Sequence, residues 1–144
     1  MEIKAVLIAT AILSTQTANA QNVESALPDG MVQAFNNFSA EMQTCQVYNL
    51  AALRCFQEMD PKSAATVQKT ADAFAELAIN SAKIVGLSEK ALFARGNLLV
   101  QGMKDDLDGN CINISVLLNK YAKKCKAAME TSSARIEEIL SGKY

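Results

Sequence analysis

Apolar residues recur at every third or fourth position along most of the chain after residue 30. This spacing is typical of amphipathic helices and differs from the strict alternation of half-buried strands. The pattern is interrupted at Asp60-Pro61, at Gly86 and at Asp108-Gly109-Asn110. It therefore predicts four helices, near residues 31–59, 62–85, 89–107 and 111–140.

The residues at these interruptions favour helix ends. Asp60 can accept hydrogen bonds from the first free N–H groups of a helix, and Pro61 is tolerated at the first helical position. Gly86 can end the second helix in the left-handed conformation, while Ser88 and Asn110 can cap the third and fourth helices. Long helices joined by short turns predict an all-α fold, an antiparallel up-down-up-down four-helix bundle.

Each predicted helix has one apolar stripe, which we expect to face a common core. The first stripe contains Phe35, Phe38, Met42, Cys45, Ala52, Phe56 and Met59, and is interrupted by Asn49. The second contains Val67, Ala71, Phe74, Leu77, Ala78 and Ile84. The third contains Leu92, Gly96, Leu99, Met103 and Leu107. The fourth contains Cys111, Ile114, Leu118, Tyr121, Cys125, Ala128, Ser132, Ile136 and Ile139.

The first twenty residues resemble an export signal. A short polar start is followed by an apolar stretch over 5–13 and then by Ala18-Asn19-Ala20, whose small residues suit a signal peptidase. The apolar stretch is shorter than the about 20 residues that a helix needs to cross a bilayer. We therefore expect a signal peptide at 1–20, export to the periplasm or the exterior, and one helical domain over 21–144 with no membrane span.

Four cysteines lie in the expected mature chain, and an even number in a small exported domain predicts two disulfides. Cys45 and Cys55 would lie about 15 Å apart along one helix, and Cys111 and Cys125 about 21 Å apart, whereas a disulfide needs Cα atoms within about 7 Å. The first and fourth helices run antiparallel in this bundle, so residues that face each other share a nearly constant sum of residue numbers. This rule predicts the pairs Cys45–Cys125 and Cys55–Cys111, which would staple the bundle.

Composition argues against several classes of function. The 14 Lys and Arg residues nearly balance 15 Asp and Glu residues, so no general attraction to nucleic acid is expected. Histidine is absent, which removes the commonest general base near neutral pH and the commonest metal ligand. The cysteine spacing lacks the close pairs of zinc sites, and no phosphate-binding or nucleophile-elbow motif is present. We therefore expect no enzyme activity, no metal and no cofactor.

The acidic turn residues form a candidate site. The segment from Asp106 to Asn110 resembles the opening of a calcium loop, but Cys111 and Leu117 replace the glycine and glutamate that such a loop needs, which favours a plain turn. In the predicted bundle the turn before the second helix and the turn before the fourth helix lie at the same end. The lysines of the fourth helix would lie further along that helix, away from this end. That end would gather Glu58, Asp60, Asp105, Asp106 and Asp108. These residues are a candidate site for a basic partner or a loosely held cation, and a solvated rim is the alternative.

Two functional hypotheses are favoured over a third, a metal- or redox-linked enzyme. The first is an exported, non-enzymatic module that binds another envelope or extracellular macromolecule through a helix face or the acidic end. The second is a carrier of a small apolar ligand held between the helices. The residues that could line such a space are Phe35, Phe38, Met42, Phe74 and Met103. At helical spacing such residues are more often ordinary core.

Overall fold

The computed structural model describes residues 27–56 and 61–144, and it is helical almost throughout. The elements in chain order are α1 (Asp29–Cys55), α2 (Pro61–Ile84), α3 (Glu89–Asp106), the 3₁₀ turn η1 (Cys111–Asn113), α4 (Ile114–Leu117), the π-helical turn η2 (Leu118–Ala122) and α5 (Lys123–Leu140). The four predicted helical segments are thus present and pack against each other, which confirms the all-α fold. The expected signal peptide at 1–20 lies outside the described residues.

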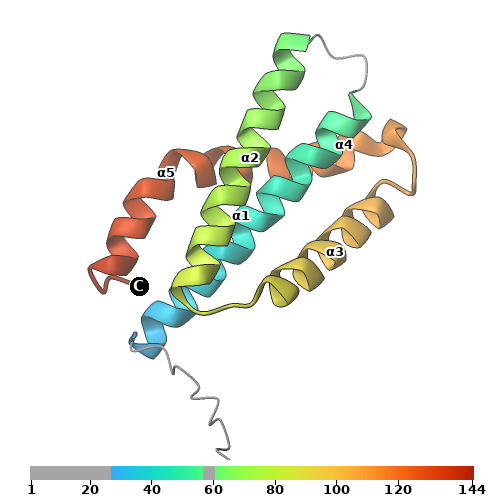
Figure 1. The fold of residues 1–144 in the computed structure, drawn as a ribbon. Helices are drawn as coiled ribbons and strands as arrows, with labels where there is room; N and C mark the ends of the chain where they lie inside the picture. Colours follow the sequence, from blue (N-terminus) through green and yellow to red (C-terminus); the bar gives the residue numbers. More distant parts are fainter. Residues whose placement is uncertain (1–26, 57–60) are drawn as a thin grey trace, which may run out of the picture.

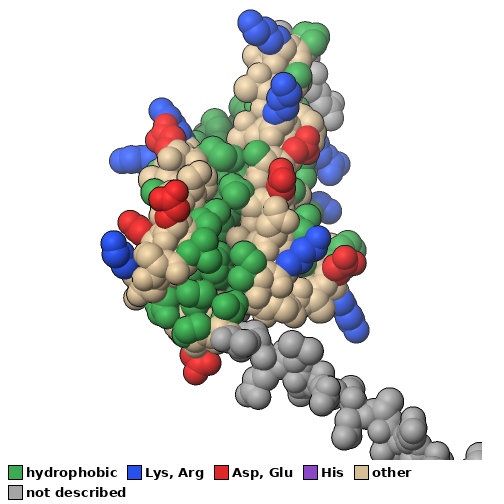
Figure 2. Space-filling view, turned by 60° about the vertical axis from the view of Figure 1, so that its left-hand side comes forward, with side chains coloured by type: hydrophobic (Ala, Val, Ile, Leu, Met, Phe, Trp, Pro, Cys, Tyr) green, Lys and Arg blue, Asp and Glu red, His purple; other side chains and the backbone are tan. Residues whose placement is uncertain are grey.

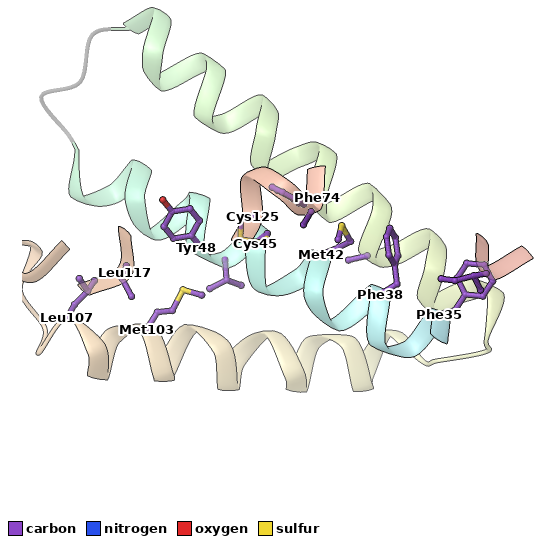
Figure 3. Packing of buried hydrophobic residues seen from close by; sticks show 14 residues of the cluster. Phe35, Phe38, Met42, Cys45, Tyr48, Phe74, Met103, Leu107, Leu117 and Cys125 are labelled. Carbon is purple, nitrogen blue, oxygen red and sulfur yellow. A yellow bond between two sulfur atoms is a disulfide. The ribbon is translucent and has the colours of Figure 1, made fainter. Parts of the chain in front are cut away.

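Helix α1 lies at the centre of the molecule. It contacts α2, α3, α4 and α5, and its most extensive contact is with α2 (Figure 1). Its side chains are buried on more than one face, because neighbours cover it from several directions. The core is built largely on α1 and is filled by Phe35, Phe38, Met42, Cys45, Tyr48, Phe74, Met103, Leu107 and Leu117, among others (Figure 3).

Both predicted disulfides are present. Cys45 is bonded to Cys125 with a Cα–Cα distance of 5.3 Å, and Cys55 is bonded to Cys111 with a Cα–Cα distance of 5.2 Å. The first bond is buried in the core, with Cys45 and Cys125 exposed by 0% and 3%, whereas Cys111 of the second bond is exposed. The bonds tie α1 to the start of α5 and to η1.

The fourth predicted helix is not one continuous α-helix, as the pattern over 111–140 had indicated. It begins as a 3₁₀ turn and is interrupted by the π turn η2, after which α5 runs in a different direction (Figure 1). A π turn shifts the positions that follow it relative to those before it. Leu117 is therefore fully buried, while Leu118 of the predicted stripe is only partly buried. The irregular stretch lies between Cys111 and Cys125.

Three residues that the stripes place in the core are exposed, and one of them is Cys111 at the start of the fourth stripe. Phe56 is 37% exposed because α1 ends at Cys55 and the backbone changes direction at the next residue. Ile84 is 45% exposed because the inward face of α2 continues through Ser81 and Ala82, and the midpoint between these two residues lies about 110° from Ile84 around the helix. Met59, which closed the first predicted stripe, lies outside the described residues.

The predicted helix ends are largely confirmed. The side chain of Ser88 accepts a hydrogen bond from the N–H of Ala91, and that of Asn110 accepts one from the N–H of Ile112. Gly86 has a φ of +70°, the left-handed conformation expected of a residue that ends a helix. Pro61 is the first residue of α2, as expected, whereas Asp60 is not among the described residues.

The core reaches the surface between α2 and α5. Figure 2 shows hydrophobic side chains gathered in a strip between these two helices. Partly buried residues on both helices, among them Leu77, Met129 and Ile136, pack against the core. The bundle is thus closed more tightly between α1 and α2 than between α2 and α5.

Candidate functional site

An apolar groove runs between α1 and the second half of α3, and we call it the α1–α3 groove. Its volume is about 390 Å³. It is lined by Val47, Leu50, Ala51, Arg54, Cys55, Val100, Met103, Lys104, Leu107, Gly109, Asn110 and Cys111. Met103 and Leu107 point from α3 toward α1 in Figure 3. A concave, mostly apolar space of this size falls within the range typical of sites for small molecules.

The groove lies between two points at which α3 and the turn after it are fastened to α1. One point is the disulfide Cys55–Cys111, whose residues both line the groove. The other is a buried polar cluster in the first half of α3. There Gly96 permits a close approach, because a Cβ at this position would lie 2.9 Å from Nε2 of Gln43. The helices are therefore held together on both sides of the groove.

The polar cluster joins α1, α2 and α3 through a chain of hydrogen bonds. Arg95 donates from Nη2 to Oγ of Ser39 at 2.8 Å and from Nε to Oε1 of Gln43. Ser39 donates in turn to the carbonyl oxygen of Ala78, and Gln43 donates from Nε2 to that of Leu92, both at 2.8 Å. Burial lowers the pKa of Arg95 from its ordinary value, because a charged group loses hydration there. Every member has a partner, so the cluster can fasten the helices without a buried polar group left unpaired.

The sequence pattern missed this cluster. Ser39 and Gln43 are 0% and 8% exposed, although polar residues in an amphipathic helix are normally expected on the solvent side. The available signal was their spacing of four residues beside the apolar stripe, which places both on one face of α1. Their partner Arg95 carried no comparable signal.

Among the residues that the structure describes, the charged residues of the groove are both cations. Arg54 and Lys104 line it, and no described Asp or Glu does. Both side chains are exposed, and within residues 27–56 and 61–144 neither forms an ion pair. Asp105 and Asp108 belong to the same end of α3 but do not line the groove. The groove therefore combines an apolar lining with two positive charges that are available to a ligand.

The predicted acidic site is described only in part, since Glu58 and Asp60 lie outside the described residues. The carboxylate of Asp106 accepts a hydrogen bond from Nζ of Lys120 at 2.7 Å and forms an ion pair with it. This lysine therefore lies closer to the acidic turn than expected. The hydrogen bond raises the pKa of Lys120. Asp105 accepts a hydrogen bond from Gln101 at 2.8 Å. In the part of the chain that is described, no group of three or more acidic or cysteine side chains is placed to hold a metal ion.

The five residues that were expected to line one ligand space do not surround a common cavity. Phe35, Phe38 and Met42 are fully buried and pack in the core. Met103 lines the α1–α3 groove, and Phe74 lines a second cavity of about 380 Å³ between α1, α2 and α5. That second cavity also contains Asn49, Thr70 and the ion pair Lys126–Glu130, with a nitrogen–oxygen distance of 3.9 Å. Because its opposite charges are matched, it favours no charged ligand.

Comparison of the chain with models of protein families, with curated proteins and with solved structures gave no match. The helices of the described ranges include none with the length and apolar character needed to cross a bilayer. The two disulfides are consistent with an oxidising, extracytoplasmic compartment. The described part of the chain is a disulfide-linked helical bundle with an apolar groove that two cationic side chains line.

Proposed function

We propose that the protein is an exported, non-enzymatic binding module that holds a small apolar ligand in the α1–α3 groove. The observation that carries the proposal is the groove itself, a space of about 390 Å³ with an apolar lining that includes Leu50 and Val100. These two side chains are 39% and 40% exposed, so they offer apolar surface that a ligand can bury.

The size of the groove favours a small ligand over a macromolecule. Twelve residues line it, whereas each side of a stable protein–protein interface comprises about 20–30 residues. The binding of an envelope or extracellular macromolecule through a helix face or the acidic end stays a prediction.

A binding role also agrees with the side chains that are present. The sequence has no histidine, and all four cysteines are in disulfides, so the chain has neither an imidazole base nor a free thiol nucleophile. Two fastened ends around an apolar space are suited to binding, because they keep the site formed before the ligand arrives.

A neutral fluorescent probe tests the proposal. N-phenyl-1-naphthylamine is apolar and uncharged, and its emission rises when it leaves water. We expect saturable binding to the mature protein with both disulfides intact. Val100→Phe places a ring in the groove and should weaken binding by about tenfold or more, since overpacking costs about 1–3 kcal/mol.

Leu98→Phe is the matched control. Leu98 also lies on α3 and is 75% exposed, but it does not line the groove, so this substitution should leave probe binding unchanged. Equal binding by both variants would place the probe elsewhere and refute the proposed site, as would the absence of saturable binding to the wild-type protein.

A further inference from the structure

The cationic residues of the α1–α3 groove lie among apolar ones. Arg54 follows the apolar lining of α1, and Lys104 follows Val100 and Met103 on α3. The two positively charged residues therefore line the same apolar groove, one from α1 and the other from α3. A ligand that only filled the space would leave them in water, whereas a ligand with an anionic group could bind both.

The geometry points to a single-chain amphiphile with an anionic head group, such as a long-chain carboxylate, as the occupant of this groove. Its apolar chain would pack against Val47, Leu50 and Met103, and its head group would lie between Arg54 and Lys104. This inference rests on the proposed function and adds the chemical class of the ligand.

Charge complementarity is the argument for an anion. Within residues 27–56 and 61–144, no carboxylate lines the groove, and neither Arg54 nor Lys104 has an ion-pair partner. Guanidinium and ammonium groups both donate hydrogen bonds to carboxylate oxygens, and the guanidinium can do so with two parallel bonds. A neutral ligand gains none of these interactions. A cationic one is repelled.

The second cavity supports the assignment by contrast. It is nearly the same size, but Asn49 and Thr70 line it, and its lysine is paired with Glu130. The α1–α3 groove is therefore the better of the two for an anionic amphiphile, because its described lining is apolar and carries a net positive charge, whereas the described charges of the second cavity cancel.

The test compares two probes that share one chain length. Dodecanoate and dodecanol carry the same apolar chain, and each is titrated below its aggregation concentration against the bound neutral fluorophore. We expect dodecanoate to displace the fluorophore at a concentration about three- to tenfold lower than dodecanol, because each of two exposed ion pairs contributes modestly to binding. This preference should shrink as salt is added, since both cations are exposed to solvent.

The double variant Arg54→Gln, Lys104→Gln should remove the preference for dodecanoate and leave dodecanol binding unchanged. The control Lys83→Gln, Lys143→Gln removes the same charge from exposed positions outside the groove and should retain the preference. Equal displacement by the two compounds, or a preference that the double variant keeps, would overturn the anionic head group while the groove stays an apolar site. A third outcome is that Val100→Phe abolishes binding of the fluorophore but neither dodecanoate nor dodecanol displaces it from the wild-type protein. That outcome would overturn a single-chain amphiphile as the ligand class. If the fluorophore does not bind, the proposed function fails first.

Discussion

The two glycines in the middle of α3 give the sharpest test of how this helix is fastened to α1. Both Gly96 and Gly102 lie within the helix, where replacing glycine by alanine usually stabilises by about 1 kcal/mol. A Cβ at Gly102 would meet nothing within 4 Å, so Gly102→Ala should raise the free energy of unfolding by about that amount.

Gly96→Ala should behave differently because its Cβ would lie 2.9 Å from Nε2 of Gln43. That amide cannot move freely, since it donates to the carbonyl of Leu92 and accepts from Arg95. Displacing it costs about 1–3 kcal/mol in broken buried hydrogen bonds, which equals or exceeds the gain in helix propensity. The net effect should be a loss of about 0–2 kcal/mol, and the two variants should differ by about 1–3 kcal/mol.

Urea unfolding with both disulfides intact, followed by circular dichroism, measures these free energies. Gly96→Ala is then repeated in a Gln43→Ala background, where no amide opposes the new methyl group and the substitution should be less harmful than in the wild type. Equal stabilisation by Gly96→Ala and Gly102→Ala in the wild type would contradict the close contact between α1 and α3. It would also remove one of the two fastenings beside the groove.

Three further outcomes are expected. Replacing Cys55 and Cys111 by alanine should lower the free energy of unfolding by about 3 kcal/mol, since with the other bond intact this bond closes a ring of about 24 residues; a loss under about 1 kcal/mol in urea unfolding would contradict this. Ser39→Ala should cost about 1–3 kcal/mol because it removes a buried hydroxyl that donates to the carbonyl of Ala78 and accepts from the partly buried Arg95, and a neutral effect in the same assay would contradict the polar cluster. Burial raises the pKa of Tyr48 above its ordinary value of 10.0, so the folded state holds this proton more tightly. Stability should therefore fall as the pH rises above about 10, and melting curves of Tyr48→Phe should show a smaller fall; an identical fall would show that Tyr48 is not responsible.

The architecture was predictable because it depends on regular features of the chain. The antiparallel arrangement of the first and last helices makes the residue-number rule valid, and this rule selected the pairs Cys45–Cys125 and Cys55–Cys111 correctly. The caps at Ser88 and Asn110 were predictable for a similar reason, because the interaction of a cap is local.

The irregular features were not predictable from the pattern. The π turn at Leu118–Ala122 interrupts a segment whose apolar spacing is regular in the sequence, so the pattern gives no local signal for it. The burial of Ser39 and Gln43 depends on a partner, Arg95, more than fifty residues away. The groove depends on how far apart α1 and α3 are held, which no single helix determines.

The most direct test of the central claim is a methyl NMR titration of the mature protein with dodecanoate. We expect saturable shifts confined to the methyl groups that line the α1–α3 groove, those of Val47, Leu50, Ala51, Val100, Met103 and Leu107. The methyl signals of Ile79 and Leu140, which are exposed elsewhere on α2 and α5, should not shift. Shifts that centre on Ile79 or Leu140, or the absence of any saturable shift, would contradict the assignment of the groove as the binding site.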